Sequence, residues 1–298
     1  MNSQFTLSCC STVDLPYAHL VQRQIPVLFY TYVVDGQEYV DDMGRDPEAL
    51  PRFYRFLQEG KLPQTSQINV AAYVDFFEQQ LQKGDLLHIA FTSGQSGSVN
   101  NAYIAAETLR EKYPERKIQV IDSLCSSSGY GLLVDEAADL RDAGKSLEET
   151  AQWVLANRNK VHHQFFSSDM TQFRRTGRVS GAAAMVATVL NICPIMRLND
   201  EGRIIAYDKV RGKKKAVAVT VENMLQHARG GADYAGRCYL CNSDCPEDAK
   251  LLTDAIEEKF PNLKGKIVQC DIGTIIGSHA GKGTVAVFFL GDERPHME

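Results

Sequence analysis

Short apolar segments alternate with segments of helical periodicity along the first half of the chain. One apolar segment runs from Phe5 to Cys9, and another, interrupted only by His88, runs from Leu86 to Phe91. Strands that alternate with helices in this way are typical of βα units around a parallel sheet. We therefore predict strands at 5–9, 27–34, 86–91 and 118–121, and helices at 46–60, 69–84, 101–113, 127–143 and 146–159.

Turn and cap residues mark several boundaries of these elements. Asp35-Gly36 predicts a tight hairpin turn between the strand at 27–34 and a short strand at 38–40. Asp46-Pro47 is typical of the first turn of a helix, because Asp accepts a free amide and Pro needs none. Ser146 with Glu149 three residues later predicts a capping box at the start of the last of these helices.

The second half of the chain has longer strands and fewer helices. We predict a domain boundary near residue 160, with one α/β domain over 1–160 and a second over 161–298, and a ligand-binding cleft between them. The predicted strands are 163–166, 195–198, 203–210, 238–241, 267–270 and 285–290, and the predicted helices are 169–174, 180–191, one ending near 227 and one following 247.

Composition narrows the class of protein. The length of 298 residues corresponds to about two domains, and 44% hydrophobic with 23% charged residues is ordinary globular usage. The net charge of −5 does not favour binding to nucleic acid or to anionic membranes through overall electrostatic attraction. No apolar run approaches the ~20 residues that a membrane-spanning helix needs. Eight cysteines are too few for a disulfide scaffold at this length, so we expect reduced thiols in a soluble cytoplasmic chain.

The loop at 92–98 is the first candidate for binding chemistry. It has four hydroxyl residues and two glycines between the carboxyl end of a strand and a helix, which suits a carboxylate or phosphate. A simple capping loop is an equal alternative at this point. The loop lacks the G-x-S-x-G pattern of a nucleophile elbow, because its second glycine is misplaced.

A second glycine-rich segment, 277–283, carries His279. It is not a Walker loop, because only three residues separate Gly277 from Gly281-Lys282, where the motif has four. In addition, Gly283 follows the lysine, where the motif has Ser or Thr. A histidine in such a loop can either have a structural role or donate a hydrogen bond to a ligand. Thr65 and Ser66 precede another helix, where capping is the simpler interpretation.

Two further patterns have weaker functional interpretations. Basic residues occupy five of the seven positions 209–215, which indicates either a solvated face or an anionic partner near the start of a helix. Cys238, Cys241 and Cys245 lack a neighbouring pair that would complete a tetrahedral metal site, so we predict no metal.

Taken in order, these segments resemble the DegV family, bacterial fatty-acid-binding proteins that act as the binding subunit of fatty acid kinase. The resemblance spans nearly the whole chain, and the order of its motifs makes it specific. The matching segments are 10–15 (Asp-Ser-Thr motif), 62–67 (Pro-Lys-Thr-Ser-Gln), 92–98 (Ser-Ser-x-Leu-Ser-Gly-Thr), 121–123, 177–180 (Gly-Arg-Ile-Ser), 209–212 (Lys-Val-Arg) and 277–281 (Gly-Ser-His-x-Gly).

The resemblance implies a three-layer α/β/α domain with a mainly parallel sheet, followed by a two-layer α/β domain with a mixed sheet. It also implies that a long-chain fatty acid lies between them, with its carboxylate held by Thr65, Ser93 and His279. Arg211 is expected to face a separate, ATP-binding kinase subunit or the phosphate it transfers. By the same resemblance, we expect the chain itself to need no cofactor, metal, nucleic acid or integral membrane association. The supporting residues of the head-group loops are Ser66, Gly94, Ser96, Gly97, Ser278 and Arg178.

The sequence departs from the family motifs at five positions and leaves rival functions open. Gln95 and Lys282 change polarity and backbone stiffness near the head group, so the ligand could be a different or shorter carboxylate. The other departures are Cys10, Gln64 and Ser98.

One rival function is that of a serine hydrolase of acyl esters, with Ser93 or Ser96 as nucleophile and His279 as base. The other is a nucleic-acid-binding regulator, which rests only on the basic run. An apolar stretch suits the acyl tail or ordinary helix packing: Ala182, Ala183, Met185, Val186, Val189 and Leu190.

Overall fold

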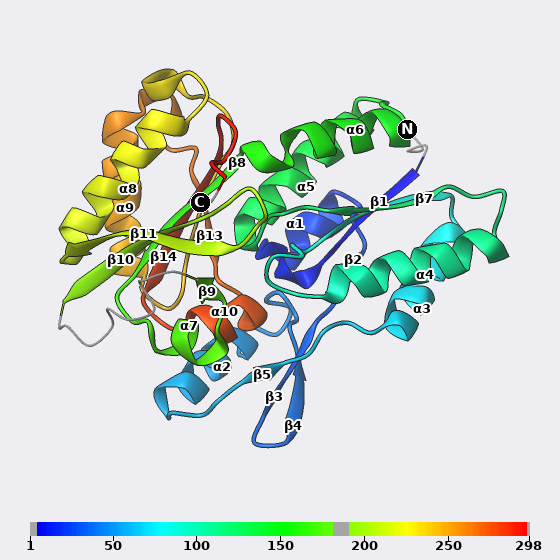
Figure 1. Cartoon of the computed structure of the whole chain (residues 1–298), viewed down its shortest axis with the longest axis horizontal. Coiled ribbons are helices and arrows are strands. Elements are labelled where there is room, and N and C mark those ends of the chain that lie inside the picture. Colours follow the sequence, from blue (N-terminus) through cyan, green and yellow to red (C-terminus); the bar gives the residue numbers. More distant parts are fainter. Residues whose placement is uncertain (1–4, 181–190, 297–298) are drawn as a thin grey trace.

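The computed structural model describes residues 5–180 and 191–296. The helix predicted at 180–191 and the apolar stretch at 182–190 therefore lie outside the described residues, apart from Ser180 and Asn191 at the ends of that helix. Figure 1 shows two sheets lying side by side, each with its own helices.

The first sheet is parallel, as the alternating pattern predicts. Its strands are ordered β2-β1-β6-β7, and helices cover both of its faces (Figure 1). The residues Leu7, Leu86 and Ile89 are fully buried, which explains why β6 is apolar apart from Asp85 and His88. The elements are β1 (Phe5–Cys10), β2 (Val27–Leu28), β6 (Asp85–Ala90), β7 (Ile118–Asp122), α1 (Tyr17–Gln22), α3 (Val70–Leu81), α4 (Ser98–Lys112), α5 (Ser127–Asp142) and α6 (Leu147–Asn157), with the short 3-10 helices η1 (Ser11–Val13) and η2 (Arg158–Lys160).

The second sheet is mixed and has the order β13-β12-β14-β8-β10-β11-β9. Helices α8 and α9 cover one of its faces (Figure 1). Its first strand begins at Val161, while the boundary between residues 160 and 161 stays a prediction. The elements are β8 (Val161–Ser167), α7 (Thr171–Thr176), β9 (Val179–Ser180), β10 (Ile192–Leu198), β11 (Ile204–Arg211), α8 (Lys213–His227), η4 (Gly231–Asp233), β12 (Cys238–Asn242), α9 (Pro246–Lys259), η5 (Pro261–Leu263), β13 (Val268–Asp271), α10 (Thr274–Ala280) and β14 (Thr284–Leu290).

A small antiparallel sheet projects from the first domain. It consists of β3 (Thr31–Val34), β4 (Gln37–Val40) and β5 (Gln64–Thr65), with α2 (Ala49–Gln58) between β4 and β5. Asp35 and Gly36 have φ values of 51° and 81°, which confirms the tight turn between β3 and β4.

One predicted strand of the first half is wrong. The segment 27–34 is divided into β2, in the parallel sheet, and β3, in the small sheet. The chain leaves the first sheet at Tyr30, whose backbone N–H donates to the Ser11 hydroxyl at 3.1 Å rather than to a neighbouring strand. The apolar pattern is continuous there because Tyr30, Tyr32 and Val34 are all buried.

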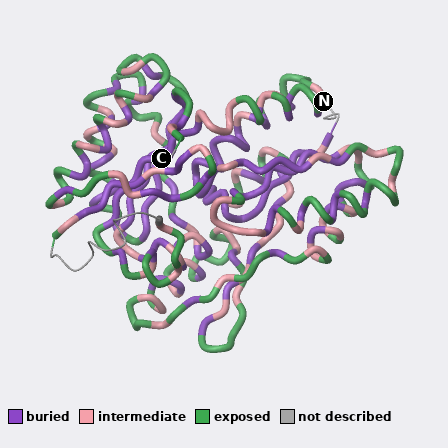
Figure 2. The backbone as a smooth tube through the Cα atoms, viewed as in Figure 1, coloured by how far each residue is buried: buried purple, intermediate pink, exposed green. Residues whose placement is uncertain are grey.

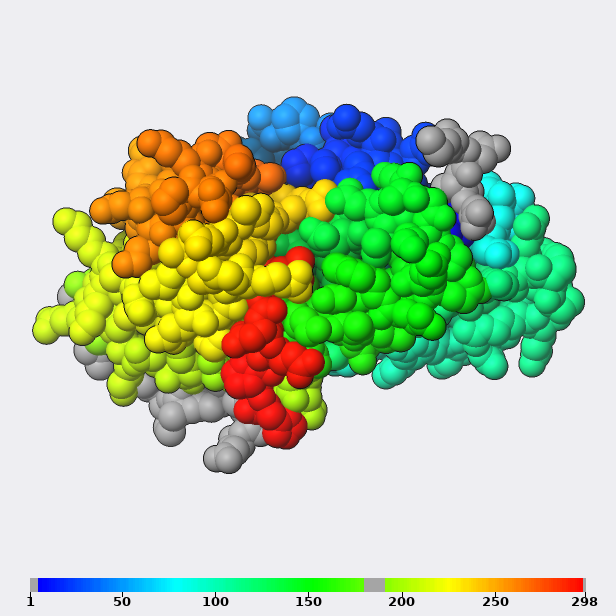
Figure 3. All heavy atoms as spheres, turned by 90° about the horizontal axis from the view of Figure 1, so that it is seen from above, coloured from blue at the N-terminus to red at the C-terminus, as the bar shows by residue number. Residues whose placement is uncertain are grey.

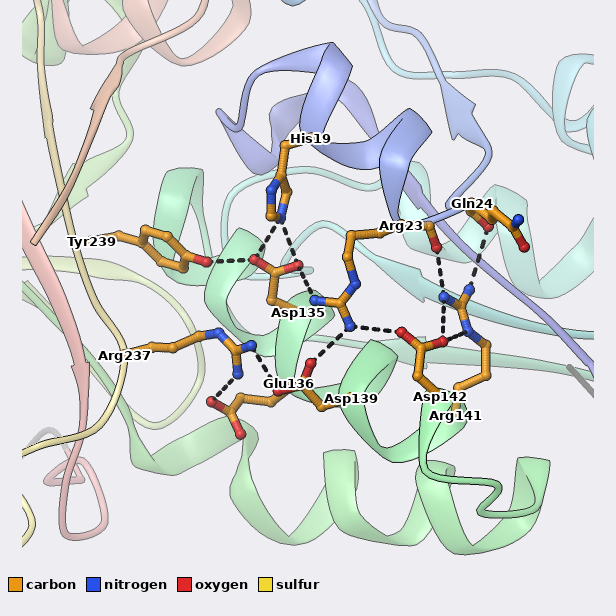
Figure 4. A network of polar contacts seen from close by, with 10 residues as sticks. All are labelled: His19, Arg23, Gln24, Asp135, Glu136, Asp139, Arg141, Asp142, Arg237 and Tyr239. Carbon is orange, nitrogen blue, oxygen red and sulfur yellow. Dashed lines mark hydrogen bonds and ion pairs between the residues drawn. The ribbon is translucent and has the colours of Figure 1, made fainter. Parts of the chain in front are cut away.

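Helix α5 connects the two domains, because it packs against β1 on one side and against β8, β12 and β14 on the other. A polar network extends this contact (Figure 4). The Asp135 carboxylate on α5 accepts hydrogen bonds from His19 of α1 at 2.9 Å and from the Tyr239 hydroxyl of β12. Arg237, next to β12, donates to Glu136 at 2.8 Å and pairs with Asp139 at 2.6 Å. Residues of both domains therefore converge on one face of α5.

Burial follows the sheets, as Figure 2 shows. The eight cysteines are buried free thiols, as the composition predicts. Within the part of the chain that the structure describes, no helix is long and apolar enough to cross a membrane.

The loop after β6 makes a close contact with the turn between β10 and β11. Gly202 has a φ of 72°, and a Cβ at this position would lie 2.1 Å from the Thr92 hydroxyl. That hydroxyl donates to the Gly202 carbonyl at 3.3 Å. Only a residue without a side chain allows this approach between the domains.

We expect Gly202→Ala to destabilise the protein more than Gly144→Ala. Gly144 also has a positive φ, of 84°, but a Cβ there would meet nothing within 4 Å. Both variants strain the backbone, whereas only the first forces Thr92 and the β10–β11 turn apart, which costs about 1–3 kcal/mol more. Urea unfolding measures the difference, and equal unfolding free energies would contradict this account of the interface.

Candidate functional site

A cavity of about 350 Å³ lies between the two domains. Its volume is within the range of small-molecule sites, and side chains from both sheets form its wall. The apolar part of the wall consists of Phe91, Phe165, Phe173, Leu198, Ile204, Ile272, Ile275, Ile276, Ala280, Ala286 and Phe288. The polar part consists of Tyr30, Thr65, Ser66, Gln67, Ser93, Gln95, Ser96, Gly97, Ser126, Ser127, His163, Arg178, His279 and Thr284.

Thr65 and His279 meet at this cavity although 214 positions separate them in the sequence. The Thr65 Oγ1 and His279 Nε2 atoms lie 2.9 Å apart and form a hydrogen bond. Thr65 ends the short strand β5, while His279 lies in the last turn of α10 and not in the loop that the glycine pattern indicates. The two residues therefore present a hydroxyl and an imidazole at one place on the wall.

The surroundings of His279 favour a neutral ring that can bind an anion. Burial and, to a smaller extent, the nearby charges of Arg178 and Arg175 together lower the pKa of His279 to about 4. Its buried Nδ1 atom has no hydrogen-bond partner among the described residues. An anion at this point would gain a hydrogen bond and the attraction of two guanidinium groups.

The loop between β6 and α4 contributes Ser93 to the same wall. The backbone N–H of Ser93 donates to Asp122 at 3.1 Å, and the N–H of Gly94 donates to the Thr92 hydroxyl at 3.0 Å. These bonds fix the loop and leave the Ser93 hydroxyl without a partner among the described residues. A Cβ on Gly97 would approach the Gln67 amide to 2.8 Å, so glycine allows the loop to pack against that side chain.

The structure brings most of the predicted site residues to this cavity, but not all of them. The exposed side chain of Arg178 lines it and donates to the Thr176 carbonyl at 2.5 Å. Gly94 and Ser278 do not line it, and the Ser278 hydroxyl instead donates to the Thr274 carbonyl within α10 at 2.7 Å. Arg211 lies at the end of β11, exposed and away from the cavity wall.

Two aspartates that sequence reasoning did not single out hold the first turn of α10. The Asp41 carboxylate accepts from the Thr274 hydroxyl at 2.7 Å and from the Thr274 N–H at 3.2 Å. Asp14 accepts from the N–H of Gly273 at 3.1 Å and from the Ser127 hydroxyl at 2.5 Å. Carboxylates are favourable at helix N-termini, and here they fix the helix that carries His279. No sequence signal indicates a partner 233 positions away.

The described residues do not form the contacts that a serine hydrolase or a cysteine metal site would need. A serine hydrolase needs a hydrogen bond between nucleophile and base. The Nε2 atom of His279 bonds to Thr65, and among the described residues no hydrogen bond joins it to Ser93 or Ser96. Cys238 and Cys241 lie within β12, and no group of three metal-ligating side chains in residues 5–180 and 191–296 includes a cysteine.

Comparison with known proteins places the chain in a family. The profile of the DegV family, described as an uncharacterised protein family, matches residues 10–292. A DegV domain-containing protein of Clostridium perfringens is 36% identical over 293 residues, which cover 98% of this chain and 99% of that protein. The chain belongs to the DegV family. The α/β class and the arrangement of a parallel and a mixed sheet are thereby confirmed as the DegV fold.

Solved structures of DegV proteins have the same architecture. A Thermus thermophilus DegV protein described by its fatty acid binding is 26% identical, with a TM-score of 0.83 over 97% of this chain and 100% of that one. The Streptococcus pneumoniae fatty acid kinase B3 protein, described as loaded with linoleic acid, is 24% identical. Its TM-score is 0.81 over 97% of this chain and 100% of that one.

Thr274 offers a test of how α10 is fixed. Thr274→Val keeps the shape of the side chain but removes the donor to Asp41, whereas Thr274→Ser keeps the hydroxyl. We expect the valine variant to lose about 1–3 kcal/mol of unfolding free energy, because it leaves a buried carboxylate oxygen with one donor fewer. Amide hydrogen exchange in α10 should be faster in the valine variant than in the serine variant. Equal exchange in the two variants would exclude a role for this hydroxyl.

Proposed function

We propose that this DegV protein binds a long-chain fatty acid in the cavity between its domains, with the carboxylate at Thr65, Ser93 and His279. The observation that carries the proposal is the Thr65–His279 hydrogen bond at the polar part of a largely apolar cavity. A fatty acid has the same division into a charged head and an apolar chain. The fatty acid binding described for the Thermus thermophilus relative supports this ligand class.

The head group would be fixed by directed hydrogen bonds. The Ser93 hydroxyl can donate to a carboxylate, and so can one member of the hydrogen-bonded Thr65–His279 pair. A neutral imidazole has one N–H, so the Nδ1–H of His279 donates when Thr65 donates to Nε2, and the Thr65 hydroxyl donates when the Nε2–H donates to Thr65. Each such charge-assisted bond contributes roughly 1.5–3 kcal/mol. Arg178 lines the same cavity and supplies positive charge, and among the described residues no carboxylate is hydrogen-bonded to it. The carboxylate would therefore be oriented by neutral donors and attracted by a guanidinium.

The acyl chain would supply most of the affinity. Each buried methylene contributes about 0.8 kcal/mol, so a long chain against the phenylalanine and isoleucine side chains outweighs the head-group bonds before ordering costs. The chain needs no cofactor for this role.

We further propose that the bound carboxylate is presented to a separate ATP-binding kinase subunit, which forms an acyl phosphate, and that this takes place in the cytoplasm. Support comes from the basic run at 209–215, which spans the end of β11 and the start of α8. The side chain of Lys213 pairs with Asp248, while Arg211, Lys214 and Lys215 are exposed. Within the described residues these three have no ion-pair partner, so their charge is available to an acidic partner or to phosphate.

Thr65→Val tests the head-group contact. The variant removes one hydroxyl at nearly constant volume, and we expect the affinity for a fluorescent fatty acid to fall about 10- to 100-fold, from the loss of a charge-assisted bond. His279→Gln should weaken binding to a similar extent. Thr108→Val is the matched control, because Thr108 is exposed on α4 and does not line the cavity. Wild-type affinity in both cavity variants would contradict the proposed head-group site.

Arg211→Glu tests the presentation step separately. We expect this variant to bind fatty acid like the wild type but to lose most acyl phosphate formation with a fatty acid kinase subunit and ATP, because charge reversal repels an acidic partner. Lys250→Glu is the control, since Lys250 is exposed on α9 and, in the part of the chain that the structure describes, pairs only with Asp254. Equal phosphorylation rates in the two variants would remove Arg211 from the kinase contact.

A further inference from the structure

Two histidines and an aspartate meet outside the lipid cavity, where the C-terminal segment returns to the second domain. His162 lies on β8, His227 ends α8 and Asp292 follows β14. The Asp292 carboxylate lies 2.9 Å from Nε2 of His162 and 3.1 Å from Nδ1 of His227. The three donor atoms lie within 4.8 Å of one another.

The backbone holds these three side chains in place. The N–H of Asp292 donates to the His227 carbonyl at 3.1 Å, and the N–H of Gly291 donates to the Lys160 carbonyl at 2.8 Å. Gly291 lies so close to both histidines that a Cβ would be 2.2 Å from the His227 carbonyl oxygen and 2.9 Å from the His162 ring. The Asp292 carboxylate is thus held beside the two histidine rings, because close backbone contacts fix the segment that carries it.

The rings are packed as well as hydrogen-bonded. The His162 ring stacks with the His227 ring, with centroids 4.9 Å apart, and with the Phe289 ring, with centroids 5.1 Å apart. The His162 side chain is 2% exposed, His227 is 22% exposed and Asp292 is 59% exposed. The group is therefore anchored in the protein at one end and open to solvent at the other.

We propose that His162, His227 and Asp292 form a binding site for a divalent transition metal, with Zn²⁺ as the reference ion. Two imidazole nitrogens and one carboxylate suit Zn²⁺, Ni²⁺, Co²⁺ or Cu²⁺, whereas Mg²⁺ and Ca²⁺ prefer oxygen ligands. Three protein ligands leave a fourth position, which solvent reaches past the exposed carboxylate. In the bound form the hydrogens of both neutral rings would lie on the nitrogens that face away from Asp292.

The position of the site gives it a structural role. In Figure 3 the C-terminal segment, in red, lies between α8, in yellow, and the green segment that contains α6. Two residues after Asp292, the buried Arg294 donates to the Leu124 carbonyl at 2.9 Å and to the Asn159 side chain at 3.0 Å. A metal on Asp292 would therefore fasten the segment through which the end of the second domain contacts the first domain. This inference does not depend on the proposed lipid.

Calorimetric titration of the chelator-treated, tag-free full chain with Zn²⁺ tests the site. We expect the wild type to bind one ion per chain. Loss of a residue that only hydrogen-bonds to a metal ligand reduces metal affinity roughly 10- to 100-fold, and we expect Asp292→Asn and His227→Gln to reduce it by more than that. Asp292→Asn is the primary variant because its exposed, isosteric side chain should leave folding intact. His296→Gln is the matched control, since His296 is exposed on the same segment and pairs with Asp200 instead.

Two further readouts separate the site from surface binding. Titration with Co²⁺ should give the visible absorption of a nitrogen-ligated ion in the wild type and in His296→Gln, but not in the two ligand variants. Zn²⁺ should slow amide hydrogen exchange at residues 290–294. The proposal is overturned if the wild type shows no saturable binding of one ion, or if Asp292→Asn and His227→Gln bind the ion as the wild type does.

Discussion

The hydrogen bond between Thr65 and His279 depends on the placement of a seven-residue helix, α10, and most of the site's geometry follows from it. A helix this short has little stability of its own. It is held at its first turn by Asp41 and Asp14, both from the first domain, while β14 follows its C-terminal end in the second sheet. The imidazole is thus positioned by residues from both domains, and its hydrogen bond to Thr65 requires that the domains are packed together.

The remaining contacts between the domains also keep the two walls of the cavity in a fixed relative position. Asp135 on α5 joins α1 to β12, and Gly202 allows the turn of the second sheet to approach Thr92 beside the cavity loop. Ser93, in that same loop, therefore has a fixed distance from the opposite wall. The fold places a few neutral donors at one point of an apolar cavity, which is an arrangement suited to binding and orienting a carboxylate rather than to a hydroxyl nucleophile activated by a base.

Local sequence signals predict local structure well. The turn at Asp35-Gly36 and the capping box of Ser146 with Glu149 are confirmed, because each depends on residues at most three positions apart. The helix predicted from Asp46-Pro47 begins only at Ala49, since the Asp46 carboxylate accepts the N–H of Glu48 in the turn before the helix. Helix α10 looks like a loop in the sequence, because Gly277 interrupts it, Gly273 and Gly281 flank it, and its stabilising partners are distant. Residue chemistry alone favours capping for Thr65 and is equally compatible with a structural or a ligand-binding role for His279. The family resemblance implies that the two act together, and the structure gives the distance between them.

Mass spectrometry of the organic extract from the purified, denatured protein is the most direct test of the central claim, with a mock purification as control. The account predicts one long-chain fatty acid per protein molecule, either retained from the host or taken up when fatty acids are added to the delipidated chain. An empty extract, together with no uptake of added fatty acids over a range of chain lengths, would contradict fatty acid binding in this cavity.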